Sequence, residues 1–379
     1  MKSVTLLSAA LASLVPHYVA AAGVTGKPEG FAAETTGGSG DCVIPADTDE
    51  LVSLLGDSTT GVVCLDKEYD FTGTEGTASE KGCAPWGTGA GCQTAINKDD
   101  WCGNYQPDAP SVDVSYDKAG LQPINVNGDK SIVGIGNKGV IKGKGLKIVS
   151  GAKNVIIQNI HITQLNPQYV WGGDAITLDG SDLVWIDHVT TSLIGRQHIV
   201  LGMEASNRVS ITNNFINGEG DYSATCNGHQ YWSMYFTGSS DKITFKNNYI
   251  FKTSGRAPKV AGDTVLHAVN NYWQGNPGHA FEMSDNAKVL AEGNLFQDVA
   301  APLEDGATGA LFSSPDASAN AACSDAVGHV CEVNQFDNSG KLSGTDSSFL
   351  SEFSGSTAAE AKPVSSVSGL ATSAGFGNI

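Results

Sequence analysis

Two cationic side chains stand close together in a segment that reads Thr-Ser-Gly-Arg-Ala-Pro-Lys. They are Arg256 and Lys259, and the glycine and proline around them are typical of a turn. A guanidinium and an ammonium fixed near each other can stabilise negative charge that develops on a reacting oxygen. Arg256 is an awkward base, because a free guanidinium effectively never loses its proton. From residue type alone the pair could stabilise an anion, although an isolated Arg is a surface salt-bridge partner in most proteins.

A third cation, Arg196, lies in the segment Ile-Gly-Arg-Gln-His. No carboxylate occurs between Asp187 and Glu204, so this part of the chain lacks the acidic ligands that calcium needs. The segment Trp-Gly-Gly-Asp-Ala-Ile carries one isolated acid, Asp174. A single carboxylate beside a guanidinium is an ion-pair partner rather than a metal site. If Asp174 lies beside Arg196, the two should form such a pair, and we expect no metal and no other cofactor.

Other catalytic patterns are missing from the sequence. It contains no Ser-His-Asp order, no Gly-x-Ser-x-Gly segment and no phosphate-binding loop. His188 follows Asp187 at the end of a β-branched run, so we interpret it as a structural residue; His198 is a still weaker catalytic candidate. The adjacent Asp99 and Asp100 lie in a cysteine-containing loop.

The 40 acidic residues outnumber the 22 basic ones and give a net charge of -18. Such a surface repels nucleic acid and anionic membranes, whereas a neutral polymer does not feel this repulsion. Solubility alone is an equally good explanation of the charge. We expect neither a nucleic acid nor a membrane as a partner.

The first residues form the pattern of a secretory signal. Lys2 is followed by an apolar run that ends in Ala20, Ala21 and Ala22, and this run is too short for a membrane anchor. We expect a signal peptide over residues 1–20, with cleavage between residues 20 and 22. The protein would then be secreted and extracellular, with residues 21–379 forming one domain.

A short β-branched run that ends near an Asn or His recurs along the middle of the chain. The runs cover residues 155–162, 183–189, 209–216, 243–250, 265–273 and 289–296. Their Asn or His residues at 159, 188, 214, 248, 271 and 294 are separated by 29, 26, 34, 23 and 23 residues. Strands at this spacing, separated by Gly- and Asn-rich turns, predict an all-β fold, a right-handed parallel β-helix. The Asn side chains should form hydrogen-bonded ladders inside the turns, and the Ser- and Ala-rich residues 355–379 should run over the outside as a tail.

Eight cysteines in an exported chain indicate disulfides rather than metal ligands. Cys83, Cys92 and Cys102 share one loop, so one of them needs a partner elsewhere in the chain. Cys42 and Cys64 flank a helix-like segment over residues 48–55 and form the last pair by elimination.

Three segments, at 171–176, 184–188 and 253–259, occur in an order that closely resembles the pectate and pectin lyase superfamily. The overall match is to the secreted pectin lyases of filamentous fungi, over nearly the whole chain. The resemblance implies an endo-acting enzyme that cleaves methyl-esterified (1→4)-α-D-galacturonan by β-elimination and leaves 4,5-unsaturated methyl esters. It also implies three disulfides: Cys83–Cys102, Cys92–Cys226 and Cys323–Cys331.

The resemblance also implies a role for each cation. The family carries an arginine at the position of Arg256, proposed as the base that removes the C5 proton; stabilisation of developing charge by Arg256 is the alternative. Lys259 would supply positive charge near the C6 carbonyl. Arg196 would fill the space that calcium occupies in pectate lyases, and Asp174 matches an acidic position shared with those enzymes. A neutral methyl ester needs no metal to make C5 acidic, so methyl-esterified pectin is the expected substrate and partner.

Aromatic residues are the second feature that the resemblance explains. Seven of them match positions that line the binding cleft of fungal pectin lyases: Trp86, Trp101, Tyr105, Trp171, Tyr231, Trp232 and Tyr235. Flat apolar walls suit a neutral methylated sugar better than a polyanion. We expect one or two of the seven to be buried. Trp185 and Trp273 lie in strand-like runs and are assigned to packing.

Three alternatives compete with this interpretation. A calcium-dependent pectate lyase on the same fold would need an acidic cluster near Arg196, and a polygalacturonase would need clustered carboxylates to activate water. A non-catalytic pectin-binding protein would not need the intact set of Arg256, Lys259 and Arg196. We expect the enzyme to act as a monomer.

Overall fold

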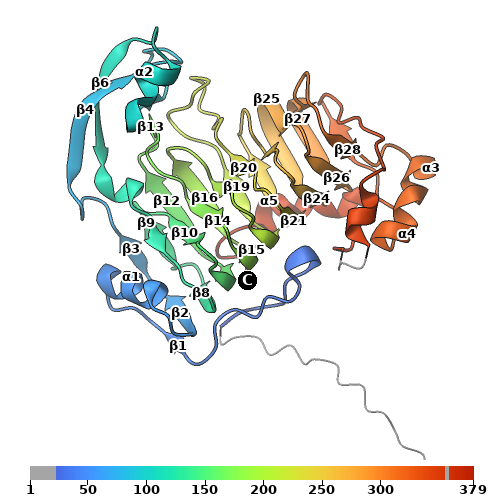
Figure 1. Ribbon diagram of the computed structural model, residues 1–379, viewed down its shortest axis with the longest axis horizontal. Helices are drawn as coiled ribbons and strands as arrows, with labels where there is room; N and C mark the ends of the chain where they lie inside the picture. The colour runs from blue at the N-terminus through green and yellow to red at the C-terminus, as the bar shows by residue number, and fades with distance from the viewer. Residues whose placement is uncertain (1–22, 355–357) are drawn as a thin grey trace, which may run out of the picture.

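Residues 23–354 and 358–379 are described by a computed structural model; the expected signal peptide at 1–20 lies outside the described residues. The chain winds into a stack of coils, and most coils contribute one short strand to each of three parallel sheets (Figure 1). Neighbouring strands within a sheet come from successive coils. This arrangement is the parallel β-helix that the repeat predicts.

The first sheet contains ten strands, and every neighbouring pair is parallel. In order they are β1 (Cys42–Val43), β2 (Gly61–Leu65), β8 (Lys130–Gly134), β11 (Lys153–Gln158), β15 (Asp182–Asp187), β18 (Asn207–Thr212), β21 (Asp241–Lys246), β24 (Val265–Val269), β26 (Lys288–Glu292) and β28 (Ala310–Phe312).

The second and third sheets meet in one long strand, β25 (Tyr272–Met283), which pairs in both. The second sheet adds β3 (Glu68–Asp70), β9 (Val140–Lys142), β12 (His161–Leu165), β16 (Thr190–Ile194), β19 (Phe215–Asn217), β22 (Tyr249–Phe251), β27 (Leu295–Leu303) and β29 (Gln335–Asp337). The third sheet adds β7 (Ile124–Asn125), β10 (Leu146–Val149), β14 (Ile176–Asp179), β17 (Ile199–Leu201), β20 (Met234–Phe236) and β23 (Lys259–Val260).

The interior of the stack is filled by apolar side chains from all three sheets. In the first sheet, Val155, Val184, Val209 and Ile243 lie in register and are fully buried. Trp273 is also fully buried and stacks on Phe296 with ring centroids 4.8 Å apart. Removal of this apolar surface from water is the main force that holds the coils together.

The turn from the first to the second sheet places a residue in the left-handed backbone region. Asn159, His188, Asn213, Asn247 and Asn270 occupy this position, with φ between 50° and 55°. Asn and His are among the few residues other than glycine that adopt this conformation readily. The recurring Asn residues of the sequence therefore have a conformational cause.

The Asn ladder lies one residue farther along the turn. Side-chain hydrogen bonds of 2.9–3.1 Å connect Asn214 to Asn248, Asn248 to Asn271, Asn271 to Asn294 and Asn294 to Asn334.

The expectation that Asn159 joins this ladder is wrong. Strand register places Asn159, like His188, in the left-handed position, and the ladder position of their coils holds Ile160 and Val189. The ladder is therefore confined to the later coils.

One end of the stack is closed by α1 (Thr48–Gly56), which agrees with the helix expected at 48–55. Asp47 accepts a hydrogen bond from the backbone N–H of Glu50, as is typical of a helix N-cap. Leu51 and Leu55 are fully buried in the core of the stack. The helix therefore covers apolar side chains that would otherwise meet water at this end.

The first and the last of the described residues run across the outside of the coils. The N-terminal segment crosses the first sheet, where Phe31 donates to Thr244 Oγ1 and Val24 packs in one cluster with the buried Trp185. Residues 358–379 cross the second sheet, and Gly377 donates to Asn159 Oδ1. The tail therefore lies on the outside as expected, held by hydrogen bonds to the turns.

The four disulfides link Cys42 to Cys64, Cys83 to Cys102, Cys92 to Cys226 and Cys323 to Cys331, which confirms all four expected pairs. Two of them fix a small side sheet made of β4 (Thr77–Cys83), β5 (Thr94–Ala95), β6 (Ser111–Asp117) and β13 (Tyr169–Val170). None of the helices within the described ranges is long and apolar enough to cross a membrane.

Replacement of Asn248 by Val should lower the free energy of unfolding by about 3 kcal/mol, because it leaves the buried N–H of Asn214 and C=O of Ile211 without partners. Valine has the shape that an earlier coil accepts at Val189, so packing alone predicts a small effect. Urea unfolding of Asn248→Val measures the loss, with the exposed Asn104→Val as control. Equal stability of the two variants would contradict a stabilising role for the ladder.

Candidate active site

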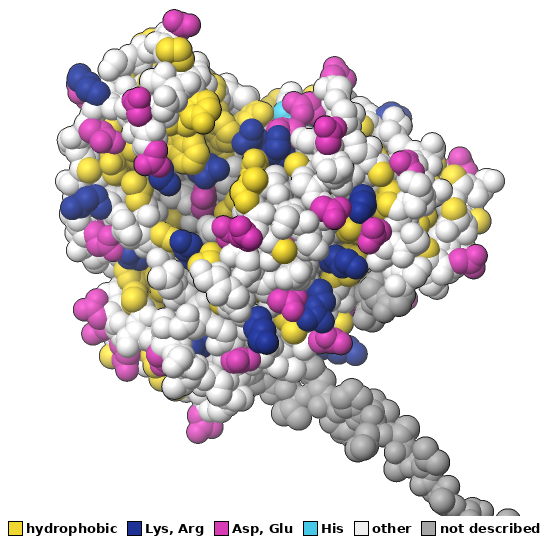
Figure 2. Space-filling view, in the orientation of Figure 1, with side chains coloured by type: hydrophobic (Ala, Val, Ile, Leu, Met, Phe, Trp, Pro, Cys, Tyr) yellow, Lys and Arg dark blue, Asp and Glu magenta, His cyan; other side chains and the backbone are white. Residues whose placement is uncertain are grey.

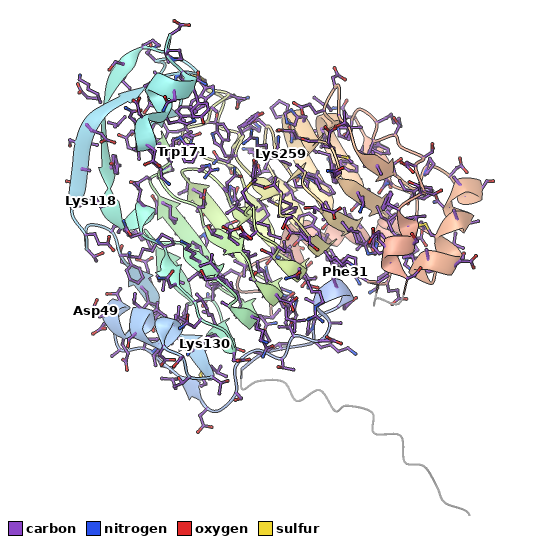
Figure 3. The ribbon with its side chains drawn as sticks, viewed as in Figure 1. Phe31, Asp49, Lys118, Lys130, Trp171 and Lys259 are labelled. Atoms are coloured by element: carbon purple, nitrogen blue, oxygen red, sulfur yellow. A yellow bond between two sulfur atoms is a disulfide. The ribbon has the colours of Figure 1, made fainter. Side chains whose placement is uncertain are left out.

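The outer face of the third sheet carries a row of side chains in register across successive coils. The row runs Lys147, Thr177, Val200, Tyr235, Lys259 and Glu282. Side chains at matching positions of a sheet point to the same side. Lys259 and Trp171 lie along the same edge of the stack in Figure 3. The row therefore forms the floor of a groove.

Arg256 lies in the turn that precedes β23, with a left-handed backbone (φ 44°). Its Nε lies 3.2 Å from Glu282 Oε2, and Lys259 Nζ pairs with the other oxygen of the same carboxylate. Its Cζ lies 5.0 Å from the ring centroid of Trp232 and 5.5 Å from that of Tyr235. The guanidinium is thus held by one carboxylate and faces an aromatic wall.

Glu282 is nearly buried, and burial by itself would raise the pKa of its carboxyl group. The imidazole of His279, with Nε2 3.6 Å from Oε2, the hydrogen bond from Lys259 and the charge of Arg256 together outweigh burial and hold the pKa of Glu282 at about 2. Glu282 is therefore an anion at any pH at which the protein is expected to work.

Arg196 lies one coil from Asp174, and the two side chains form an ion pair with Nη1 3.3 Å from Oδ2. The other carboxylate oxygen of Asp174 accepts a hydrogen bond of 2.8 Å from the backbone N–H of Gln197. The Cζ of Arg196 lies 4.2 Å from the ring centroid of Trp171. Asp174 thus contacts Arg196 and the chain beside it, as the sequence predicts.

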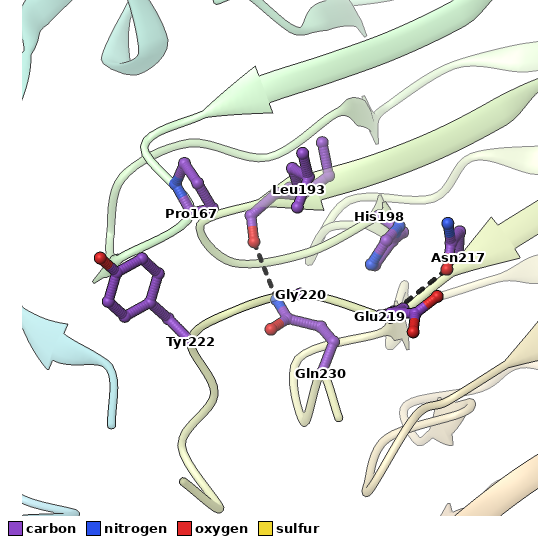
Figure 4. Close-up of a pocket in the computed structure, with 10 residues that line it drawn as sticks. Pro167, Leu193, His198, Asn217, Glu219, Gly220, Tyr222 and Gln230 are labelled. Atoms are coloured by element: carbon purple, nitrogen blue, oxygen red, sulfur yellow. Dashed lines mark hydrogen bonds between the residues drawn. The ribbon is translucent and has the colours of Figure 1, made fainter. Parts of the chain in front are cut away.

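Two glutamines hold the segment that carries Arg196. Gln230 reaches the chain beside Leu193, where its amide donates to the backbone oxygen of Ile194 (Figure 4). The same amide donates to the backbone oxygen of Arg196 at 2.8 Å, and Gln93 donates to that of Gly195 at 3.0 Å. These buried bonds fix the backbone from which Arg196 projects.

A row of four tryptophan rings in contact runs from Arg196 to Arg256. Centroid distances are 6.0 Å from Trp171 to Trp101, 6.3 Å from Trp101 to Trp86 and 5.6 Å from Trp86 to Trp232. Tyr231 packs edge-on against Trp232, and Tyr105 stacks on Trp101. The disulfides of Cys83 and Cys92 anchor the loop that supplies Trp86 and Trp101.

The expectation that one or two of these seven aromatic residues are buried is wrong. Six are partly exposed and Tyr105 is exposed. Trp86, Trp101 and Tyr105 come from the segment that links the strands of the side sheet, and Tyr235 lies on the outer face of the third sheet, so none of these rings is inside a coil. Figure 2 shows yellow side chains gathered beside dark-blue and magenta ones around a hollow. A cavity of about 480 Å³ lies next to Trp171, Asp174 and Arg196.

The residues that sequence reasoning set aside lie elsewhere. His188 is in a turn between the first two sheets, 2.8 Å from Asp187 Oδ2. His198 is fully enclosed, and burial lowers the pKa of its imidazole to about 3. Asp99 and Asp100 are exposed in the cysteine-containing loop.

Sequence reasoning missed two residues of the site, Glu282 and His279. They lie in the segment Gly-His-Ala-Phe-Glu-Met, and Glu282 meets Lys259 only because β25 and β23 are neighbours in register. His279, Glu282 and Glu304 offer ligand atoms within 4.8 Å of one another. Both oxygens of Glu282 are already paired with cations, so this trio is a poor metal site.

Comparison with known proteins decides the family. A family model described as pectate lyase matches residues 104–370. The chain is 59% identical to pectin lyase A of Emericella nidulans over 377 residues, which are 99% of each chain. It is 60% identical to pectin lyase 2 of Aspergillus oryzae, with 94% of this chain and 95% of that one covered.

The chain belongs to the pectate lyase family. Among solved structures, a pectate lyase from Bacillus sp. N165 in complex with trigalacturonate has a TM-score of 0.60 and 18% identity, covering 92% of this chain and 99% of that one. A pectate lyase from Acidovorax avenae gives a TM-score of 0.57 at 15% identity, with 98% and 99% covered. These two likenesses support the β-helix fold of this pectate lyase family member.

Replacement of Glu282 by Gln should destabilise the protein by about 2 kcal/mol near pH 6, because Arg256 and Lys259 lose their shared counter-charge. A carboxyl group whose pKa falls on folding stabilises the protein above its ordinary pKa of 4.5. That contribution disappears as the pH falls towards about 2. The difference between parent and variant should therefore shrink between pH 6 and pH 3.

Urea unfolding at both pH values measures this difference. Glu304→Gln is the matched control, since Glu304 is more exposed and, among the described residues, its carboxylate forms an ion pair only with His279, at 3.9 Å. A Glu282→Gln effect that stays the same at pH 3 and pH 6 would show that the charge of Glu282 does not matter to folding.

Proposed function

We propose that this protein is an endo-acting pectin lyase that cleaves methyl-esterified galacturonan by β-elimination, giving 4,5-unsaturated oligogalacturonide methyl esters. The observation that carries the proposal is Arg256, paired with Glu282 at the edge of an aromatic groove, in a chain about 60% identical to proteins named pectin lyase. Partly exposed rings suit a neutral methylated polymer.

The reaction moves charge towards the cations of the site. The C5 proton passes to a base, either Arg256 itself or a solvent water molecule, and its loss places negative charge on the C6 ester oxygen. The electron pair then expels the C4 glycosidic oxygen, which takes up a proton from solvent and leaves as a hydroxyl group. Arg256 and Lys259 lie side by side on one carboxylate, so they can stabilise that oxygen together. We propose catalytic roles for both.

The ion pair with Glu282 bears on which role Arg256 plays. An anion 3.2 Å from Nε favours the protonated guanidinium, and only a neutral guanidine can accept a proton. Direct transfer from C5 to Arg256 therefore requires that substrate first separates the pair. The geometry favours charge stabilisation as the main role of Arg256.

We propose that Arg196 replaces a metal in this groove. Its guanidinium pairs with Asp174 and lies over Trp171, which leaves this carboxylate engaged by a cation of the protein itself. A neutral ester already withdraws electrons from C5, so a second positive charge from calcium is not needed. The substrate-binding role of the seven aromatic residues is part of the same proposal.

Secretion and monomeric action complete the proposal. Four disulfides fit an oxidising compartment, and the first 20 residues carry the pattern of a signal peptide. One apolar core runs from Leu51 to Leu342, which supports a single domain after cleavage.

Highly methylated pectin should be cleaved equally well with and without a chelator, and activity should fall as esters are removed. The absorbance of the 4,5-unsaturated product measures cleavage of esterified and de-esterified polymer. Calcium and sodium are compared at equal ionic strength to separate a bound ion from screening. Loss of activity on chelation, or preference for polygalacturonate, would identify a pectate lyase instead.

The Arg256→Lys variant should lose nearly all activity on methylated pectin although it keeps the charge. An ammonium cannot place several N–H donors in the plane of a guanidinium. The initial rate of unsaturated-product formation is compared with that of Lys242→Arg, a change at a distant lysine on the first sheet. A rate within about tenfold of the parent, roughly 1.4 kcal/mol in barrier, would remove Arg256 from the mechanism.

A further inference from the structure

The groove beside Arg196 continues past the aromatic wall into a second cavity. The first cavity has a volume of about 480 Å³ and the second about 600 Å³, and both are lined by Pro123 and Lys147. Because the linings share these residues, the two cavities form one groove. It runs over the outer face of the third sheet towards β7.

Lys147 belongs to the row of side chains that also carries Lys259. Between them in register lie Thr177, Val200 and Tyr235, so the two lysines are four strands apart on one face. At about 4.8 Å per strand, roughly 19 Å separates their backbones. Lys147 therefore faces the same groove as Lys259, several sugar units away from it.

Two cations at this end of the groove have no acidic partner. Within the described part of the chain, neither Lys147 nor Lys98, which both line the first cavity, forms an ion pair, whereas Lys144, which lines the second cavity, pairs with Glu75. Lys98 lies over the ring of Trp171, with Nζ 5.6 Å from its centroid. Acidic residues outnumber basic ones by 40 to 22 in this protein, so carboxylates are not scarce. These two cations are left available to a ligand.

We infer that this end of the groove is a binding site for the free carboxylate of a non-esterified galacturonate unit, held by Lys147 and Lys98. The inference rests on the proposed function and adds to it. The galacturonate unit next to Lys259, where the bond breaks, must be a neutral ester. A unit about 19 Å away, next to Lys147, would bind better as a free carboxylate. The net charge of -18 does not prevent this, since charges beyond about 10 Å are largely screened at 0.1 M salt.

The inference predicts that the loss of activity on going from fully methylated to half-esterified pectin is smaller in the parent than in a variant that lacks Lys147. Lys147→Gln should lower kcat/KM on half-esterified pectin, through KM, about fivefold more than it lowers kcat/KM on fully methylated polygalacturonate. Lys147→Arg keeps the charge, so the ratio of its kcat/KM values on the two substrates should stay that of the parent. Lys138→Gln, an exposed lysine away from the groove, is the control.

Binding of unesterified trigalacturonate, measured by calorimetry, tests the same site without turnover. Lys147→Gln should weaken it about fivefold, and the weakening should disappear in 1 M salt. An unchanged affinity together with an unchanged preference between the two pectins would overturn the inference while leaving the proposed function intact. A parent that makes no unsaturated product from any pectin would instead refute the proposed function. Circular dichroism of each variant establishes that it is folded.

Discussion

The whole arrangement depends on a turn of two residues between the first and second sheets. One residue must adopt the left-handed backbone, and Asn or His does so at positions such as Asn213 and Asn247. Because the turn is short, it allows one register between neighbouring coils, and a shift by one residue would turn every inward side chain outward. The same register that buries Val209 on Ile243 places Lys259 opposite Glu282. Core and site are therefore fixed by one constraint.

The position of the groove follows from what covers the other two sheets. The N-terminal segment bonds to Thr244 and Ser210 on the outside of the first sheet. The C-terminal residues bond to the turns and pack on Tyr249 and Tyr272 of the second. The side sheet stands over the third sheet as a wall and leaves the floor accessible. The two ends of the chain thus leave the third sheet as the face with room for a long polymer.

The sequence predicted the features that depend on neighbouring residues. It did not predict the contacts that depend on the register between coils. The β-branched runs, the turns and the helix near Leu51 depend on neighbouring residues, so their patterns survive in the sequence. The ladder position differs from the left-handed position by one residue, and no local signal separates Asn159 from Asn214. Glu282 forms an ion pair with Arg256 although the two are 26 residues apart in the sequence. This separation is the length of one coil with its insertion. Such pairs follow from the register of coils and not from a motif.

The charges of the site match the reaction intermediate better than its substrate. Arg196 and Asp174 cancel each other, whereas Arg256 and Lys259 share one carboxylate and leave about one positive charge in excess. An esterified galacturonate unit is neutral, and it gains one negative charge when C5 loses its proton. In the mechanism proposed above, this partly desolvated excess charge would bind the intermediate more strongly than the ground state, which is the condition for catalysis. Glu282 sets this balance: without it the excess would be about two charges, and free carboxylates of the ground state would be attracted to the place where the ester must lie.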